Sequence, residues 1–225
     1  MREIALDTET TGLDPKSGDR IVEIGCVEMM GHMATGRSFQ VYINPERDMP
    51  DGAFRVHGLS SEFLSDKPVF ADVVDDFLAF LEDSPLVIHN ATFDLGFINA
   101  ELERVGHAPI QLARTTDTIE IARRKFPGSP ANLDALCKRF GINLAGRELH
   151  GALLDARLLA DVYLELVGGR EPGLALSKAS ATAAERRGEA ETRSRREARP
   201  HAPSADELAR HKAFLEKITD PLWSS

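Results

Sequence analysis

A chain of 225 residues, 42% of them hydrophobic, is long enough to bury one sizeable core and to leave residues for an appendage. Two cysteines exclude a disulfide framework and a cysteine-rich metal site. The sequence contains neither a bilayer-length apolar run nor a signal-peptide pattern, which predicts a cytoplasmic protein without a membrane contact. The net charge is −9, which excludes a broad basic face for duplex DNA. The acidic charge lies in residues 1–176, which hold 17 Lys and Arg against 28 Asp and Glu, whereas residues 177–205 hold 7 Lys and Arg against 4 Asp and Glu.

The first part of the chain predicts β-structure. Residues 2–6 indicate a short buried strand that ends in a polar loop reaching residue 19. Two β-rich runs follow at 21–30 and 37–43. The short connection between them, 31–36, predicts that the two runs form an antiparallel hairpin.

Helices dominate from residue 66 onward. Asp66-Lys67-Pro68 is typical of a helix start, and the apolar residues of 69–81 recur on one helical face. A short apolar strand is predicted at 86–89, and further helices are predicted at 93–105, 119–125, 133–140 and 152–167. Strands followed by alternating helices and strands predict an α/β fold with a mixed sheet.

The sequence divides into a folded domain, 1–169, a linker, 170–205, and a tail, 206–225. The linker is predicted to be flexible, because a stretch rich in Ala, Ser, Arg, Glu and Pro, without aromatic residues, cannot offset an ordering cost of about 1–2 kcal/mol per residue. The tail predicts a helix that starts at a capping box, 204–207, and carries an apolar stripe. A lone amphipathic helix of this length is marginal in water, so the tail predicts a protein partner.

Two carboxylates lie close together in Asp7-Thr8-Glu9, where the first predicted strand ends. Strand alternation places Asp7 and Glu9 on the same face of the sheet. Their like charges would repel each other unless a cation lay between them. Acidic residues at strand ends are common, so a solvated pair is the alternative for this motif taken alone.

Two further motifs place a carboxylate near a helix start. Asp94 falls in the first turn of the helix 93–105, where the helix dipole favours a carboxylate, and an ordinary first-turn acid is the alternative. His150 precedes the last helix of the domain, and a surface histidine is the alternative there. Asp155 lies one turn inside that helix beside its apolar stripe, where a charge needs a partner or a metal.

Taken together, these four carboxylates and the histidine predict a two-metal nuclease. Carboxylate oxygens suit Mg²⁺ or Mn²⁺, and no Cys/His cluster in the sequence competes as a zinc site. Two such cations about 3.5–4 Å apart would stabilise both the attacking and the leaving oxygen of a phosphodiester displacement. His150 would deprotonate the attacking water near neutral pH.

Three motifs of this sequence resemble, in order and spacing, those of the DEDD exonuclease superfamily, in its subgroup with a histidine. They are D-T-E-T-T-G from residue 7, H-N-A-T-F-D from residue 89 and H-G-A-L-L-D-A from residue 150. The resemblance covers residues 1 to about 168. It implies a ribonuclease H-like fold, with a mixed five-stranded sheet flanked by helices, and magnesium-dependent 3′-to-5′ hydrolysis.

Carried over to this sequence, the resemblance implies His150 as the general base and four carboxylates as ligands of two Mg²⁺ or Mn²⁺ ions: Asp7, Glu9, Asp94 and Asp155. Asp7, Glu9 and Asp155 would also contact the substrate.

The same resemblance implies a pocket for the 3′-terminal nucleotide. Thr10 and Gly12 would lie against that nucleotide. His57, in the segment V-H-G-L at 56–59, would contribute to the same pocket. A plain turn is the alternative for His57-Gly58.

The tail resembles the C-terminal segment through which epsilon subunits of bacterial DNA polymerase III bind the polymerase alpha subunit, because a basic linker precedes D-E-L-A-R-H-K-A-F-L-E and a terminal L-W. This resemblance implies a proofreading exonuclease of the bacterial cytoplasm that acts on single-stranded or frayed DNA 3′ ends. Residues 171–176 resemble a sliding-clamp-binding peptide with Glu for the usual Gln and Leu for the terminal Phe, and a domain-exit strand is the alternative. The sequence leaves a small theta-like third subunit open.

Two other functions are compatible with parts of this sequence. An exoribonuclease of the same superfamily would use the same motifs, because recognition of a 2′-hydroxyl depends on pocket shape. A non-catalytic scaffold of a polymerase complex would explain the tail, but it has no physical need for five active-site residues. The tail argues against the exoribonuclease, so the sequence favours a DNA exonuclease.

Overall fold

In the computed structural model, five strands form one mixed sheet in the order β3-β2-β1-β4-β5. The long strands β1 (Arg2–Thr10), β2 (Ile21–Met30) and β3 (Met33–Tyr42) are antiparallel neighbours. The short strands β4 (Leu86–Ile88) and β5 (Thr115–Asp117) run parallel to β1. The predicted mixed five-stranded sheet is confirmed.

The structure describes residues 1–144, 149–168 and 202–218. The chain divides into two compact units, Met1–Leu174 and Ala175–Ser225. The first unit contains the sheet and the helices that pack on it, and the second contains one described helix.

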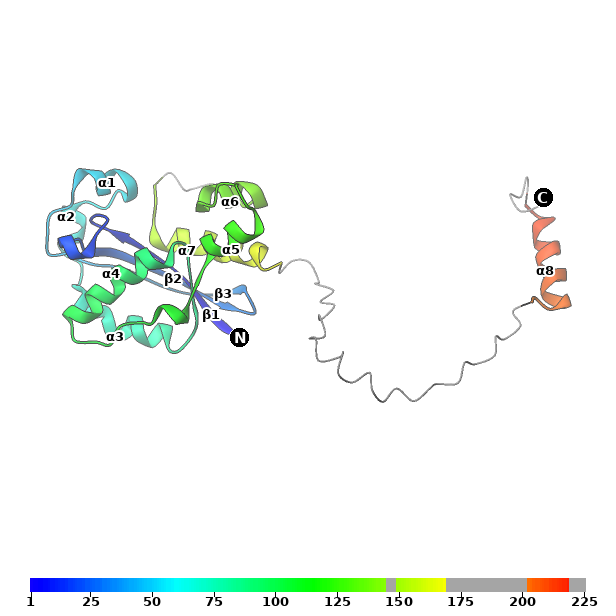
Figure 1. Ribbon diagram of the computed structural model, residues 1–225, viewed down its shortest axis with the longest axis horizontal. Helices are drawn as coiled ribbons and strands as arrows, with labels where there is room; N and C mark the ends of the chain where they lie inside the picture. The colour runs from blue at the N-terminus through cyan, green and yellow to red at the C-terminus, as the bar shows by residue number, and fades with distance from the viewer. Residues whose placement is uncertain (145–148, 169–201, 219–225) are drawn as a thin grey trace. The chain divides into compact units, whose positions relative to one another are not determined.

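Helices cover both faces of the sheet, as Figure 1 shows. Ile4 and Leu6 of β1 point into a core that α3 (Phe70–Leu81) and α4 (Ala91–Arg104) close. Ala5 points into a second core on the opposite face. The helices of that face are α5 (Thr118–Lys125), α6 (Leu133–Phe140) and α7 (Ala152–Leu166). The two-residue period of β1 therefore supplies both hydrophobic cores.

The β-hairpin is confirmed, but two predicted bounds in this region are wrong. β1 continues to Thr10, so the acidic motif lies within the strand rather than after it. β3 begins at Met33, and the connection is only Gly31-His32, with φ of 58° and 69° at the two residues. Positive φ at both positions is the geometry of a tight two-residue hairpin turn. The start of β3 is exposed at the sheet edge, so its sequence lacks the apolar alternation of a half-buried strand.

Short elements escaped the sequence analysis. Two helices, α1 (Asp51–His57) and α2 (Ser61–Leu64), and two 3₁₀ turns, η1 (Pro15–Ser17) and η2 (Leu112–Arg114), have too few residues to show a helical period. The edge strand β5 consists of two threonines and an aspartate, which is a polar sequence without alternation. The longer helices lie within two residues of their predicted bounds.

The second unit contains α8 (Ala205–Leu215), and its predicted capping box is present. The Ser204 side chain accepts a hydrogen bond from the Glu207 backbone, and the Glu207 carboxylate accepts one from the Ser204 backbone. Leu208 and Phe214 are 54% and 59% exposed. Both side chains are thus available to a partner.

Other predictions for the C-terminal region fall wholly or largely outside the described residues. These are the flexible linker at 170–205, the clamp-binding peptide at 171–176 and the contribution of Trp223 to the tail. Among the helices that the structure describes, none has the length and apolar character needed to cross a membrane.

Candidate active site

The first two candidate carboxylates lie next to each other on one face of β1. Asp7 and Glu9 share this face with Ala5, which packs toward α7 and its neighbours. In the sheet register, Asp7 lies opposite Gly25 of β2 and Glu9 lies opposite Glu23. Glu9 is buried and Asp7 is half-buried.

Asp94 enters the site from the other layer. It lies in the first turn of α4, as predicted, and its Oδ1 accepts hydrogen bonds from Thr8 N at 3.0 Å and Thr8 Oγ1 at 2.7 Å. The turn that leads into α4 contains Asn90 with a φ of 72°. Asp117 holds this turn, because its carboxylate accepts from the backbone N–H groups of Asn90 at 3.2 Å and Ala91 at 3.0 Å.

His150 and Asp155 come from the start of α7. Asp155 lies one turn inside the helix and is buried, as predicted, while His150 lies outside the helix and is exposed. His150 Nδ1 lies 3.2 Å from Asp155 Oδ2. The His150 backbone N–H donates to the Val56 carbonyl at 3.1 Å, which ties this segment to α1.

Burial, with a smaller contribution from neighbouring carboxylates, raises the pKa of two of these side chains. Burial raises the pKa of Asp7 well above its usual range, and the charges of Asp94, Glu9 and Asp155 raise it further. Burial also raises the pKa of Asp94 to about 7, although the hydrogen bonds from Thr8 oppose the shift. A site that resists ionisation in this way is suited to bind positive charge.

The side chains that converge most tightly are Glu9, His150 and Asp155, whose ligand atoms all lie within 4.8 Å of one another. This set differs from the four carboxylates of the sequence prediction, because it includes the histidine and leaves out Asp7 and Asp94. Asp7 nevertheless lies close enough to Glu9, Asp94 and Asp155 to feel their charges. Carboxylate oxygens and one imidazole form a donor set that fits a hard divalent cation.

Two cavities meet at these residues. A cavity of about 490 Å³ is lined by Glu9 together with all three residues predicted for the nucleotide pocket, Thr10, Gly12 and His57. A cavity of about 260 Å³ is lined by Asp7, His150 and Asp155. Because Glu9 is within 4.8 Å of His150 and Asp155, the acidic centre lies where the two cavities adjoin.

The larger cavity has an apolar wall and a buried imidazole. Pro50, Ala53, Val56 and Phe93 line it beside the backbone of 8–13. His57 ends α1, and Gly58 follows with a φ of 72°, so the segment is a helix end rather than a plain turn. Burial lowers the pKa of His57, whose Nδ1 accepts from the Leu59 N–H at 3.0 Å. An apolar wall of this kind suits an apolar or aromatic part of a ligand.

Glu23 belongs to the site, and the sequence analysis missed it. It is buried on β2, and its Oε2 accepts from the backbone N–H of Ala152, the first residue of α7, at 3.0 Å. Its Oε1 accepts from Gln40 Nε2 at 2.7 Å. Glu23 therefore holds the start of the helix that supplies Asp155. The available signal was a charge inside the apolar run 21–30.

Gly25 brings α7 against the sheet. A Cβ atom at this position would lie 2.2 Å from the backbone carbon of Ala152 and 2.2 Å from the nitrogen of Leu153. Any larger residue would push the start of α7 away from Asp7, which lies opposite Gly25 on β1. Glycine is needed here because there is no room for a Cβ atom, and not because the backbone conformation is unusual.

Gly25→Ala is therefore expected to lower both stability and hydrolysis. Overpacking against backbone costs roughly 1–3 kcal/mol, and a displacement of Asp155 by about 1 Å costs on the order of 100-fold in rate. Thermal unfolding and kcat on single-stranded DNA measure the two effects. Gly96→Ala is the matched control, because Gly96 is an exposed residue of α4 with nothing within 4 Å of an added Cβ, and it should be neutral or stabilising. Equal behaviour of the two variants would contradict this role of Gly25.

Comparison with known proteins gives a family match and full-length relatives. The model of the exonuclease family matches residues 4–163. DNA polymerase III subunit epsilon of Rickettsia conorii is 52% identical over 222 residues, which cover 97% of this chain and 96% of the relative. The protein of the same name from Escherichia coli K12 is 47% identical over 176 residues, covering 75% of this chain and 72% of the relative.

Solved structures show the same fold. Exonuclease X in complex with 5′-overhanging duplex DNA is 26% identical, with a TM-score of 0.56 over 74% of this chain and 90% of that chain. The nuclease domain of 3′hExo, a DEDDh family member bound to rAMP, is 17% identical, with a TM-score of 0.64 over 74% and 92% of the two chains. The ribonuclease H-like fold expected from the sequence motifs is thereby confirmed.

Proposed function

Because this chain belongs to the exonuclease family of DNA polymerase III epsilon subunits, we propose that it removes mispaired nucleotides from DNA 3′ ends for the replicative polymerase, through the acidic centre at the start of α7. The products are nucleoside 5′-monophosphates, and the reaction takes place in the bacterial cytoplasm. One observation carries the proposal: Glu9, His150 and Asp155 converge within 4.8 Å beside Asp7, where two cavities adjoin.

The roles follow from chemistry and placement. Asp7, Glu9, Asp94 and Asp155 would hold two divalent cations, Mg²⁺ or Mn²⁺, which would supply charge neutralisation at the scissile phosphate. His150 takes the proton of the attacking water, since an imidazole exchanges protons near neutral pH. Its exposed ring, 3.2 Å from Asp155, is oriented by that carboxylate and can pass the proton to solvent.

The larger cavity receives the 3′-terminal nucleotide. Thr10 and Gly12 contribute the strand side of this cavity and His57 the α1 side. The cavity receives an unpaired end, and a mismatched end unpairs at lower cost than a matched one. Selectivity for mismatches thus arises mainly from the lower free-energy cost of unpairing a mismatched DNA end.

A digestion series tests this function. Single-stranded DNA, matched and mismatched duplex 3′ ends, and an RNA of the same sequence are incubated with the protein, with and without Mg²⁺. We expect Mg²⁺-dependent release of 5′-monophosphates, fastest from single-stranded and mismatched DNA. Faster degradation of RNA than of DNA would instead assign the protein to 3′-end processing of RNA.

The tail binds the polymerase alpha subunit. Support comes from the exposed apolar residues of α8 and from the Rickettsia conorii relative, which aligns with 97% of this chain. A flexible connection of roughly 30 residues would span on the order of 30 Å, which keeps the nuclease near the polymerase at high effective concentration. Residues 171–176 contact the sliding clamp weakly, and a theta-like subunit is a further candidate partner.

Deletion of 206–225 is expected to abolish association with the polymerase alpha subunit while hydrolysis of single-stranded DNA stays unchanged, because α8 belongs to a unit separate from the catalytic one. Co-elution in size-exclusion chromatography measures the first effect and kcat/KM the second. Phe214→Asp, in the full chain, should weaken co-elution through one exposed contact. A truncated chain that still co-elutes would contradict the role of the tail.

A further inference from the structure

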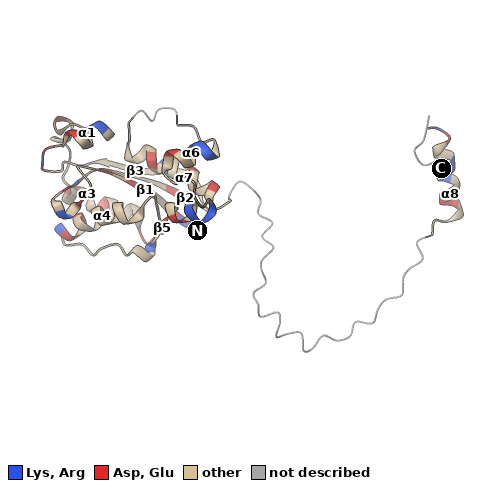
Figure 2. Ribbon diagram, turned by 45° about the horizontal axis from the view of Figure 1, so that its top comes forward, with Lys and Arg blue, Asp and Glu red and all other residues tan. Residues whose placement is uncertain are grey.

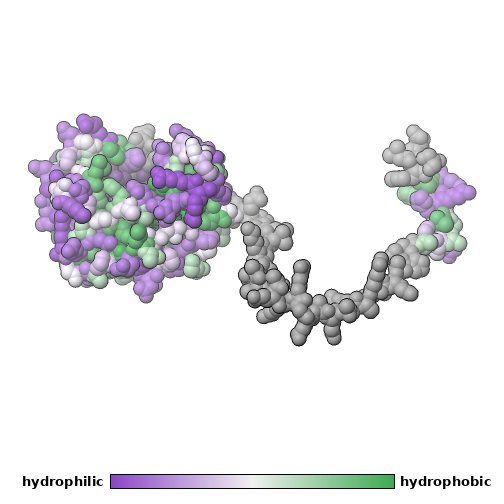
Figure 3. Space-filling view, viewed as in Figure 1, coloured by the Kyte–Doolittle hydropathy of each residue, from purple (hydrophilic) through white to green (hydrophobic). Residues whose placement is uncertain are grey.

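One segment of the catalytic unit is basic, although that unit as a whole is acidic. Residues 118–140, which form α5, α6 and the loop between them, hold five Lys and Arg against two Asp and Glu, whereas the whole chain has a net charge of −9. Figure 2 shows Lys and Arg on α6, and Figure 3 shows strongly hydrophilic residues gathered where Figure 1 draws α5 and α6.

Some basic side chains of this segment serve the fold. Lys125 Nζ donates to the Leu166 carbonyl at 3.0 Å at the end of α7, and the Arg139 guanidinium lies 4.3 Å from the Phe126 ring centroid. Arg123 differs from both. It is exposed, and within the described part of the chain its guanidinium makes no hydrogen bond, ion pair or ring contact.

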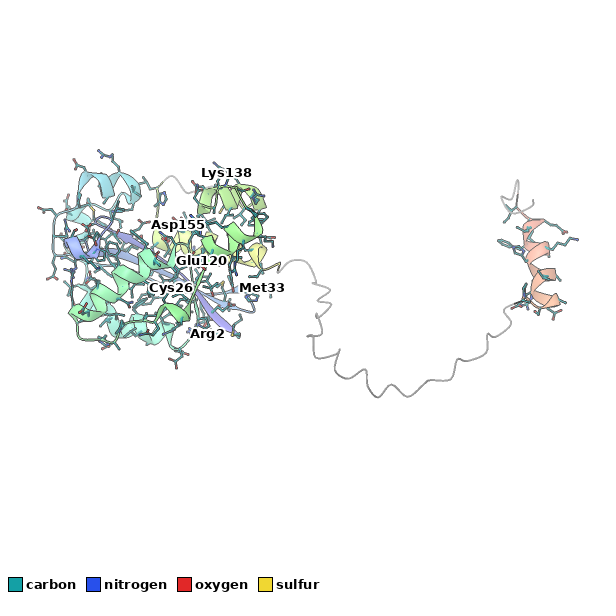
Figure 4. The ribbon with its side chains drawn as sticks, in the orientation of Figure 1. Arg2, Cys26, Met33, Glu120, Lys138 and Asp155 are labelled. Carbon is teal, nitrogen blue, oxygen red and sulfur yellow. The ribbon has the colours of Figure 1, made fainter. Side chains whose placement is uncertain are left out.

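Arg123 lines a cavity that continues the catalytic one. This cavity, about 570 Å³, shares His89 and Asn132 with the cavity that contains Asp7, His150 and Asp155. Three cavities therefore follow one another: the nucleotide pocket with Thr10 and His57, the acidic cavity, and the cavity with Arg123. Figure 4 labels Asp155 on α7 and Lys138 on α6, the two helices that contribute Asp155 and Asp134 to the lining of the acidic cavity.

A single strand has a direction across this series. With the 3′-terminal nucleotide in the first cavity, the scissile phosphate lies at the carboxylates, and the strand must leave on the remaining side. That side ends at the positively charged Arg123 guanidinium, which suits a backbone phosphate and carries no sequence preference.

We propose that Arg123 binds the backbone phosphate of the DNA strand upstream of the scissile phosphodiester, so that the end of α5 guides the strand into the acidic centre. The inference rests on the proposed function. The contact acts on substrate binding and leaves the chemical step unchanged, because Arg123 lines neither of the two cavities that meet at the carboxylates.

Two substrates separate the strand contact from the chemistry. The p-nitrophenyl ester of thymidine 5′-monophosphate has no upstream phosphate, and a 12-nucleotide single-stranded DNA has several. Arg123→Gln should raise KM for the 12-mer about threefold to fivefold, leave its kcat unchanged and leave hydrolysis of the ester unchanged. The slope of log(1/KM) against log salt should fall by about 0.7, the value for one phosphate contact on a single strand.

Arg157→Gln is the matched control. Arg157 is also exposed and without a partner among the described residues, and it lines a cavity at β3 that shares no residue with the three cavities above. Its KM and salt slope should equal those of the unchanged protein. Arg123→Lys, which keeps the charge, should restore most of the salt slope.

Several outcomes would overturn the assignment. An unchanged KM of Arg123→Gln on the 12-mer would remove the strand contact and leave the nuclease function standing. Equal losses in Arg123→Gln and Arg157→Gln would reduce the effect to overall charge. Equal losses on the ester and the 12-mer would place Arg123 in the support of the active site. A protein without activity on either substrate would instead refute the proposed function itself.

Discussion

Asp7→Ala is expected to abolish nearly all hydrolysis of single-stranded DNA at saturating Mg²⁺. Asp7 is buried enough, and close enough to Asp94, Glu9 and Asp155, for burial and their charges to raise its pKa. In the proposed mechanism, its loss would remove a ligand of the cations and with it the charge neutralisation at the phosphate. Release of 5′-monophosphates measures the effect, and an unchanged rate would favour a scaffold whose acidic cluster has no catalytic use.

Removing the charge of Asp7 should stabilise the metal-free protein, although it abolishes hydrolysis. A carboxyl whose folded-state pKa is raised is stabilising while it is protonated, and this contribution is lost as the pH rises through the folded pKa. In EDTA, the unchanged protein should therefore lose stability from mildly acidic pH towards pH 8. Asp7→Asn, which keeps the shape and removes the charge, should melt at a higher temperature at pH 8 and gain less from added Mg²⁺.

This pair of measurements distinguishes a ligand from a structural residue. Inactivity with a raised melting temperature in EDTA is the signature of a site whose charges repel one another. Inactivity with a lowered melting temperature would mean that Asp7 supports the fold. Asp161→Asn on the exposed side of α7 is a suitable control, since its loss should change neither quantity.

His150→Ala is expected to lower kcat by about 10²–10⁴-fold, the range for loss of a general base. Because the four carboxylates remain, binding of Mn²⁺ measured by isothermal titration calorimetry should be largely kept. His150→Gln retains a polar side chain near Asp155 without a titrating group, so it should be as slow as the alanine variant.

The close grouping of His150 with Glu9 and Asp155 makes this experiment decisive. If His150 were a metal ligand, Mn²⁺ affinity would fall together with the rate. If it is the base, kcat should fall in both variants while the metal affinity stays. The two roles thus predict different binding isotherms.

Long periodic elements of this fold could be predicted from the sequence. The helices of 70–81, 133–140 and 152–166 show a continuous apolar face, and β2 is an unbroken β-rich run, so their patterns follow from burial. Asp94 and Asp155 could be placed in first turns for the same reason, since a helix start fixes the residues that follow it.

What the sequence did not predict depends on contacts between distant segments. Glu23 gains its role from the N–H of Ala152, which lies 129 residues away in the chain. β5 is a strand because it pairs with β4, and its own residues are polar. The close approach of His150 to Glu9 likewise arises when α7 packs on β2. A local sequence pattern does not predict the distance between these two side chains.

Thr8 adds a mechanical consequence. It lies between Asp7 and Glu9 on β1 but points to the other layer, where it holds Asp94 of α4, while Asp155 arrives from α7 on the opposite layer. The acidic centre is thus assembled from both hydrophobic cores at once. Any slippage of one layer against the other would separate its carboxylates before either layer melted. Phe77→Ala, which opens a cavity in the core that α3 and α4 close, should therefore lower kcat on single-stranded DNA at temperatures below the thermal unfolding transition of the variant.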